Sequence, residues 1–232
     1  MEAVILAGGL GTRLRNVVRD VPKPMAPVAG KPFLTYLLDY LSEQTVNEVI
    51  LAVGYKREVI QSYFGNKYNG ITIAYSVENT PLKTGGALKK ALNDCEEDQV
   101  VVLNGDTFYH VDLREMMRFH MFHHADITMA VKKMTNFDRY GTVDFDDDYR
   151  IVRFNEKQPC KSGFINGGVY IFRRKIFSHF DDDCFMLEKD FMEKSVQSNV
   201  FSAFVCNDYF IDIGIPEDFQ KAGIDFQKFQ GK

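Results

Sequence analysis

A glycine-rich run near the N-terminus has the residue types needed to bind a polyphosphate. Residues 8–13 read GGLGTR. Glycines let the backbone turn sharply and present its N–H groups to an anion, and the guanidinium of Arg13 adds a planar fork of charged donors. The run is not a dinucleotide fingerprint, because position 14 is Leu14 rather than glycine, and the chain lacks the Gly-Lys-Ser/Thr of a P-loop. A tight turn with an exposed arginine is the structural alternative.

Lys23 is the second candidate for phosphate binding. It stands between Pro22 and Pro24, and each proline restricts the backbone at its own and at the preceding position. An ammonium group on such a stiff backbone loses little entropy when it binds a phosphate. Taken alone, the segment is also typical of an extended surface turn. Together with the run 8–13, it predicts a second cation for the same polyphosphate.

The elements around these residues alternate between strands and helices. Apolar runs predict strands at 2–6, 48–53, 71–75 and 99–103, and helical spacing predicts helices at 33–41, 56–64 and 84–92. This alternation is typical of βαβ units with parallel strands. Beyond a helix at 112–124, we expect strands at 126–132, 142–145, 150–154, 168–172 and 201–205, and helices at 188–196 and 216–229. The pattern predicts one continuous α/β domain, a Rossmann-like three-layer sandwich with a mixed, mostly parallel central sheet.

The unusual residues fall at one edge of this predicted sheet. The run 8–13 follows the first strand, residues 78–86 follow the third, and Asp106 follows the fourth. Open α/β sheets bind ligands at the carboxyl ends of their parallel strands. We therefore expect these three segments to line one cleft.

Composition excludes several classes of protein. The 232 residues are 45% hydrophobic and 26% charged, which is ordinary for a globular chain. The formal net charge of -4 argues against a nucleic-acid partner and against an anionic membrane partner. No apolar run reaches the roughly 18–20 residues of a membrane span. The cysteines form no CxxC pair, so we expect neither a zinc site nor disulfides, but a cytoplasmic protein with reduced thiols.

Over nearly its whole length the chain resembles the sugar-1-phosphate nucleotidylyltransferase family. The resemblance starts with LAGGLGTRL at 6–14 and PKPM at 22–25. It continues with Glu78 and LKTGGA at 82–87, NGD at 104–106, YGTV at 140–143, EK at 156–157, INGGVY at 165–170 and DIGIPE at 212–217. The segments PKPMAP at 22–27, FDRYGT at 137–142 and YFID at 209–212 are most similar to the branch that transfers GMP to D-glycero-D-manno-heptose 1-phosphate. Lys83 stands where most members carry glycine.

The resemblance implies a nucleotidyltransferase or GT-A-like fold over 1–232, with a nucleotide-binding half at 1–125 and a sugar-phosphate-binding half at 126–232. It implies that Arg13, Lys23 and Asp106 act in catalysis. The residues implied to bind the nucleotide are Leu6, Ala7, Gly8, Gly9, Gly11, Thr12, Arg13, Lys23, Glu78, Thr84, Gly85, Asn104, Gly105 and Asp106. Those implied to bind the sugar phosphate are Tyr140, Gly141, Glu156, Lys157, Asn166 and Gly167.

Asp106 and Asp212 are the metal ligands that the resemblance implies. Mg²⁺ keeps several waters and is held by one or two carboxylates together with substrate phosphates, so two aspartates from different strand ends suit it. The alternatives are structural: an aspartate in Asn-Gly-Asp is typical of a turn, and Asp212 could cap a helix that starts at Pro216.

The implied reaction joins a nucleoside triphosphate, GTP in this branch, to a sugar 1-phosphate and releases pyrophosphate. A mannose-1-phosphate guanylyltransferase and a hexose-1-phosphate uridylyl- or thymidylyltransferase are the nearer alternatives. A GT-A-type glycosyltransferase releases no pyrophosphate and does not need the run 8–13 with Lys23, and a non-catalytic sensor need not keep the chemical groups. Because the chain would be a small member of this family, the resemblance predicts a homodimer.

Three histidines share one face of the expected helix at 112–124. They are His120, His123 and His124. Neither a carboxylate ligand nor an HExxH pattern accompanies them, so we expect a solvated helix face rather than a metal site.

Overall fold

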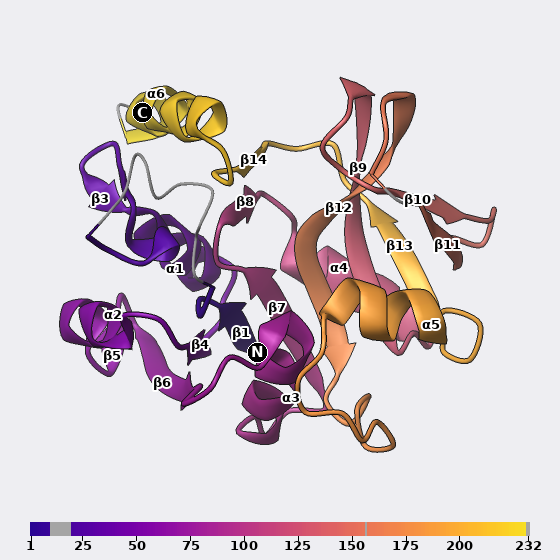
Figure 1. Cartoon of the computed structure of the whole chain (residues 1–232), viewed down its shortest axis with the longest axis horizontal. Helices are drawn as coiled ribbons and strands as arrows, with labels where there is room; N and C mark the ends of the chain where they lie inside the picture. Colours follow the sequence, from indigo (N-terminus) through magenta and orange to yellow (C-terminus); the bar gives the residue numbers. More distant parts are fainter. Residues whose placement is uncertain (10–19, 156, 231–232) are drawn as a thin grey trace.

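A ten-stranded sheet forms the centre of the protein (Figure 1). The computed structural model describes residues 1–9, 20–155 and 157–230. The strands of this sheet are β1 (Glu2–Leu6), β4 (Glu48–Val53), β5 (Lys67–Tyr68), β6 (Ile71–Val77), β7 (Gln99–Asn104), β9 (Ile127–Phe137), β10 (Thr142–Phe145), β11 (Ile151–Asn155), β12 (Cys160–Arg173) and β13 (Phe201–Val205). Their order is β11-β10-β12-β7-β1-β4-β6-β5, and β9 joins by pairing with β12 and β13.

The sheet is mixed, as the sequence predicts, and its central strands are parallel. β1 pairs in parallel with β4 and β7, and β4 pairs in parallel with β6. In this register Leu6 lies beside both Ala52 and Asn104, so the carboxyl ends of three strands stop at the same level. β12 then adds antiparallel to β7, which brings the second half of the chain against that same edge.

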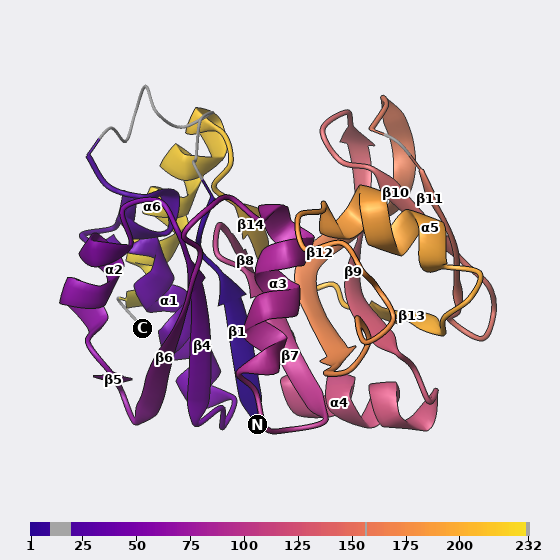
Figure 2. The same cartoon turned by 60° about the horizontal axis from the view of Figure 1, so that its bottom comes forward.

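Helices cover both faces of the sheet. They are α1 (Phe33–Glu43), α2 (Arg57–Phe64), α3 (Lys83–Asn93), α4 (Leu113–Phe122), α5 (Glu193–Ser195) and α6 (Pro216–Gln230), with a 3-10 turn η2 (Lys23–Met25) and a π-helical turn η3 (Leu187–Met192). Because strand side chains alternate between faces, Ile5 joins the buried cluster that holds Phe33 of α1, and Val4 joins the one that holds Leu88 of α3. Figure 2 shows α3 against β1 and β7. These two clusters establish the predicted three-layer arrangement.

The end of the chain returns to the side of the molecule that holds the first strands. β14 (Phe210–Asp212) pairs antiparallel with β8 (Thr107–Tyr109) in a separate two-stranded ladder. Phe226 of α6 then packs against Phe33 and Tyr36 of α1, close to the hairpin of β2 (Pro27–Val28) and β3 (Lys31–Pro32). β14 and α6 therefore lie over β1, β4 and α1, across from β9 to β12 (Figure 1).

Most predicted elements are present, and the differences have local causes. β1, β4, β10 and β13 have the predicted bounds. β12 is longer than the predicted strand at 168–172, because a bulge between Asn166 and Tyr170 interrupts its pairing without ending it. The short strands β2, β3, β5, β8 and β14 have no periodic pattern long enough to predict.

His120 corrects the expectation of a solvated histidine face. Its side chain is buried on α4, with Nδ1 2.8 Å from Thr128 Oγ1 and Nε2 2.8 Å from Gln99 Oε1. Burial lowers its pKa to about 4, so the ring is neutral at pH 7. None of the helices among the described residues is long and apolar enough to span a membrane.

Candidate active site

The carboxyl ends of the parallel strands meet around two close backbone contacts. Gly105 N donates to Leu6 O at 3.0 Å, and a methyl group at Gly105 would lie 2.6 Å from the same oxygen. A side chain at Gly8 would overlap the carboxylate of Glu78. Ala7 N is fixed by a bond to the end of β4, at Ala52 O. Backbone packing requires glycine at position 105, and Gly8 and Glu78 lie in contact, so these segments converge as expected.

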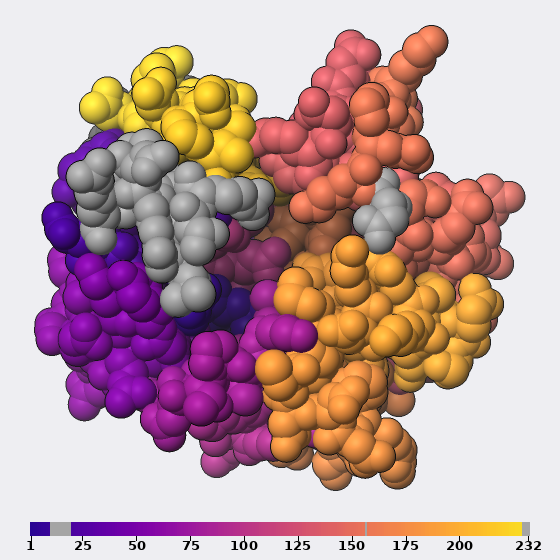
Figure 3. Space-filling view, in the orientation of Figure 1, coloured from indigo at the N-terminus to yellow at the C-terminus, as the bar shows by residue number. Residues whose placement is uncertain are grey.

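A hollow lies above this edge of the sheet. Figure 3 shows it near the middle of the face, between the indigo and purple N-terminal part and the orange second half. The segments just described lie at its inner end, because they are the carboxyl ends of β1 and β7. The position agrees with the ligand site of open α/β sheets.

Glu78 is a half-buried carboxylate on the β6 side of the site. Its Oε2 accepts a hydrogen bond from Leu82 N at 2.9 Å, while Oε1 faces Gly8. Burial raises its pKa, and the Leu82 bond and the charge of Lys90 act in the opposite direction. A carboxylate in this position can accept hydrogen bonds from the N–H groups of a ligand.

Lys23 brings the predicted cation and the predicted metal ligands together. It is the first residue of η2, where Pro24 and Met25 are buried and anchor the turn. The Lys23 ammonium lies 2.5 Å from Asp106 Oδ2 and 3.9 Å from Asp212 Oδ1. The Lys23 side chain is only 10% exposed, whereas those of Asp106 and Asp212 are 35% and 22% exposed, so the carboxylates remain open to solvent.

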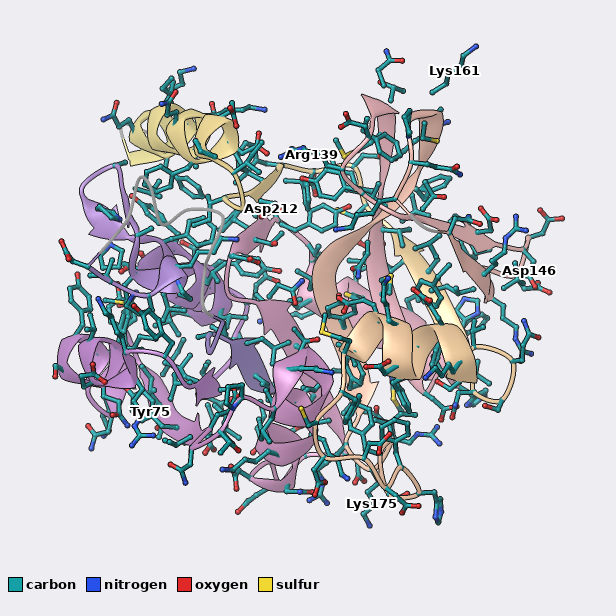
Figure 4. The ribbon with its side chains drawn as sticks, viewed as in Figure 1. Tyr75, Arg139, Asp146, Lys161, Lys175 and Asp212 are labelled. Carbon is teal, nitrogen blue, oxygen red and sulfur yellow. The ribbon has the colours of Figure 1, made fainter. Side chains whose placement is uncertain are left out.

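The β8–β14 ladder explains how Asp106 and Asp212 come to face one cation. Asp212 is registered opposite Thr107, and Ile213 N donates to Asp106 O at 3.0 Å. Gly214 N donates to Asp212 Oδ1 at 2.7 Å, which fixes the rotation of that carboxylate (Figure 4). In the described ranges no group of three or more His, Cys, Asp or Glu residues could hold a metal. A pair of carboxylates fits a cation that is also held by phosphates.

A bulge in β12 lies beside the end of β7. The pairing of β12 with β9 shifts between Asn166 and Tyr170, and Gly168 takes a φ of 72°. Asn166 Nδ2 donates to the Tyr170 hydroxyl at 2.7 Å, and Asn104 also hydrogen-bonds that hydroxyl. Gly167 sits within the bulge. Because Val169 registers with Leu103 of β7, the bulge and Asn104 lie side by side.

Tyr140 and Lys157 approach the site from the second half of the chain. Tyr140 lies in the segment between β9 and β10, directly before Gly141. Burial, followed by the negative charge of Asp212, raises the pKa of Tyr140 to about 12, so this ring lies near the carboxylate pair. Lys157 follows β11 and is exposed. The remaining predicted residues Gly11, Thr12, Arg13 and Glu156 lie outside the described part of the chain.

Glu188 is a carboxylate near the candidate site that the sequence analysis does not single out. It lies in η3, where burial raises the pKa of its carboxyl group, the charge of Lys157 lowers it and the charge of Asp106 raises it. It therefore shares one electrostatic environment with a predicted sugar-phosphate ligand and a predicted metal ligand. No pattern marks it in the sequence, because a carboxylate in the first turn of a helix is common.

Thr84 and Gly85 hold the segment that leads into Glu188. Thr84 Oγ1 accepts a hydrogen bond from Leu187 N at 3.0 Å, and Gly85 N donates to Phe185 O at 2.9 Å. A side chain at Gly85 would overlap the ring of Phe185. These contacts give both residues a packing role, and their binding of a base remains a prediction.

An ammonium, two carboxylates and closely packed glycine backbones therefore meet at the carboxyl edge of the sheet. The family model described as "Nucleotidyl transferase" matches residues 2–228. The chain is 50% identical to a D-glycero-alpha-D-manno-heptose 1-phosphate guanylyltransferase of Aneurinibacillus thermoaerophilus, over 99% of this chain and 100% of that protein. It is 46% identical to the protein of the same name from Campylobacter jejuni, over 94% of this chain and 97% of that protein.

A solved structure agrees with the fold. The crystal structure of HddC from Yersinia pseudotuberculosis complexed with GMP-PN superimposes with a TM-score of 0.87 at 40% sequence identity. The match covers 97% of this chain and 99% of that chain.

Proposed function

The chain belongs to the nucleotidyl transferase family, and we propose that it transfers GMP from GTP to D-glycero-α-D-manno-heptose 1-phosphate, releasing pyrophosphate. The full-length relatives that carry this activity in their names support the choice of both substrates. The product is a GDP-heptose, an activated sugar for glycan synthesis.

The nucleophile of this reaction needs no general base. A phosphate monoester has a second pKa of roughly 6, so the sugar 1-phosphate is mostly a dianion at neutral pH. One of its oxygens forms a bond to the α-phosphorus of GTP, while the bond from that phosphorus to the pyrophosphate breaks. The obstacle is the repulsion between two polyanions, so alignment and charge neutralisation supply most of the rate.

Different residues would bind the two anionic substrates. The Lys23 ammonium, held at the carboxyl ends of the strands, would contact the reacting phosphates. Gly105 lets its backbone pack against Leu6 O and so holds the loop that carries Asp106 at the edge of the sheet. Lys157 would bind the phosphate of the sugar. Arg13, assigned from the sequence alone, would hold the departing pyrophosphate.

Asp106 and Asp212 would hold Mg²⁺ together with substrate phosphates. The arrangement fits this ion, because the two carboxylates already face one positive charge, and the donors are all oxygen. The ion would supply charge neutralisation at the α-phosphate. Lys23 would then lie beside the ion and contact the same phosphates.

Glu78 supports guanine as the base. Guanine carries two neighbouring donors, N1–H and the exocyclic amine, and a carboxylate accepts from both. Glu78 has Oε2 bonded to Leu82 N and Oε1 beside Gly8, in the loop that follows β1. Uracil and thymine present a single N–H at the corresponding edge, so they would gain less from the same carboxylate.

The observation that carries the proposal is the contact of Lys23 with both Asp106 and Asp212 at the carboxyl edge of the sheet. The test is a pyrophosphate-release assay with GTP, ATP, UTP and dTTP, each against heptose, mannose and glucose 1-phosphates. We expect the largest kcat/KM with GTP and the heptose 1-phosphate. A higher value with mannose 1-phosphate would change the assigned sugar, and no release with any pair would refute the function.

The proposal places the enzyme in the cytoplasm, where GTP is available. The four cysteines are free thiols, which suits that compartment. Assembly as a homodimer stays a prediction, which light scattering of the purified protein tests.

A further inference from the structure

An ion pair joins two parts of the molecule that approach the site from opposite sides. Arg139 lies in the segment between β9 and β10, and Asp218 lies in the first turn of α6. Arg139 Nη2 is 2.6 Å from Asp218 Oδ2, and the two side chains are 39% and 23% exposed. Figure 4 shows Arg139 and Asp212 close together between the two sides.

A second contact joins the same two segments. The guanidinium of Arg139 lies 5.3 Å from the centre of the Tyr140 ring, and Nη2 is 3.4 Å from its hydroxyl oxygen. The Tyr140 ring in turn meets Phe210 of β14 edge to face, with 6.1 Å between ring centres. Arg139 and Tyr140 therefore contact the chain on both sides of Asp212: at Phe210 before it and at Asp218 after it.

The corner that these contacts hold carries the carboxylate pair. Asp212 is the last residue of β14, and Ile213 is tied to Asp106 O. Gly141, the predicted sugar-binding residue, follows Tyr140 directly. The distance between the sugar-binding segment and the metal-binding corner is therefore set by the contacts of Arg139 and Tyr140.

We propose that the Arg139–Asp218 pair is a clamp that fixes the 138–141 segment against the β14–α6 corner and so positions the sugar 1-phosphate for attack. Arg139 acts as a positioning residue. The proposal rests on the proposed function, because it assumes that Tyr140 and Gly141 face the sugar. The clamp joins the segment between β9 and β10 to the β14–α6 corner, whereas Gly8, Glu78 and Gly105 follow β1, β6 and β7, so we expect its loss to affect the sugar 1-phosphate more than GTP.

The test compares Arg139→Ala, Asp218→Ala and the double variant with the wild type. We expect each single variant to raise KM for the sugar 1-phosphate about tenfold, because a segment that is no longer held must be ordered when the sugar binds. KM for GTP stays within about twofold of wild type. The double variant is no worse than Arg139→Ala, because Asp218 acts through its contact with Arg139.

Arg153→Ala is the matched control. Arg153 forms an ion pair of the same length, 2.6 Å, with Asp144, but this pair lies within the β10–β11 hairpin and is 70% and 41% exposed. The Arg153–Asp144 pair does not connect the two sides of the site. Its loss should therefore leave the KM for GTP and the KM for the sugar 1-phosphate unchanged. Thermal melting of every variant shows whether the fold is retained.

Two results would overturn the clamp while the function stands. One is a sugar KM within twofold of wild type in Arg139→Ala and Asp218→Ala. The other is an equal rise of the GTP and sugar KM values, which indicates general loss of structure.

The charge reversal Arg139→Asp with Asp218→Arg should restore part of the sugar affinity lost in Arg139→Asp alone. If the wild type itself releases no pyrophosphate, the proposed function fails instead.

Discussion

Lys23 and Asp106 form an ion pair of 2.5 Å, although 83 positions separate them in the chain. Their contact joins the proposed phosphate-binding cation to a proposed metal ligand in one place. The ammonium also reaches Asp212, so it offsets the repulsion between two carboxylates that the β8–β14 ladder holds side by side. The arrangement concentrates charge of both signs where two polyanionic substrates must meet.

Replacement of either carboxylate should abolish metal-dependent turnover. We expect Asp106→Asn and Asp212→Asn each to lower kcat by about 10²-fold or more, because the amide removes the negative charge that would hold the ion. Pyrophosphate release with increasing Mg²⁺ measures the effect, and circular dichroism reports the fold. Asp147→Asn, in the exposed turn after β10, is the control and should behave as wild type. Wild-type activity that survives EDTA would refute the metal assignment.

Loss of the Lys23 ammonium should slow the chemical step. We expect Lys23→Ala to lower kcat by about 10²-fold, the scale of removing one charged donor from a transition state. Single-turnover kinetics with GTP and the sugar 1-phosphate separate this step from product release. Lys31→Ala, on the exposed strand β3, should keep the wild-type rate. If Lys23→Ala raises only the KM values, the residue binds the ground state and does not act in the transition state.

Lys83 adopts a backbone conformation that favours glycine, with a φ of 59° at the start of α3. We expect Lys83→Gly to raise the free energy of unfolding by about 0.5–1 kcal/mol, since relief of left-handed strain outweighs the added freedom of the unfolded chain. Urea unfolding measures it. Lys175→Gly, at an exposed turn residue without a positive φ, should instead lower stability by a few tenths of a kcal/mol. Equal losses in both variants would contradict the strain argument.

Buried His120 should make stability depend on pH. Its pKa falls from about 6.5 in the unfolded chain to about 4 in the folded protein, because burial disfavours the charged ring. The unfolded state binds the proton first as pH drops, so the protein should lose up to about 3 kcal/mol between pH 6.5 and pH 4. Urea unfolding at pH 7.5, 5.5 and 4.5 should show a shallower pH dependence in His120→Gln than in wild type. The exposed His179→Gln should follow wild type, and parallel curves for all three proteins would disprove the effect.

The sequence predicts well the parts of the site that follow long periodic elements. Gly8, Glu78 and Asp106 were assigned to one edge because each follows an apolar strand, and Leu6, Ala52 and Asn104 do end at one level. A run of buried aliphatic residues marks such a strand within the local sequence. The residue that follows the run therefore lies at the carboxyl end of the strand.

The parts that depend on short or distant pairings could not be predicted. The β8–β14 ladder has three residues in each strand, and its register alone decides that Asp212 meets Asp106. The position of Glu188 depends on the docking of the preceding segment against Thr84 and Gly85. His120 was misassigned because its partners, Thr128 and Gln99, lie on separate strands whose contact with α4 leaves no periodic signal.

The most direct test of the account is ³¹P NMR of GTP and D-glycero-α-D-manno-heptose 1-phosphate incubated with the wild-type protein and Mg²⁺. The account predicts that the three GTP signals and the sugar-phosphate signal decline together, while pyrophosphate and the paired doublets of a diphosphate ester grow in equal amounts. Release of inorganic phosphate, or consumption of GTP without the sugar phosphate, would contradict it.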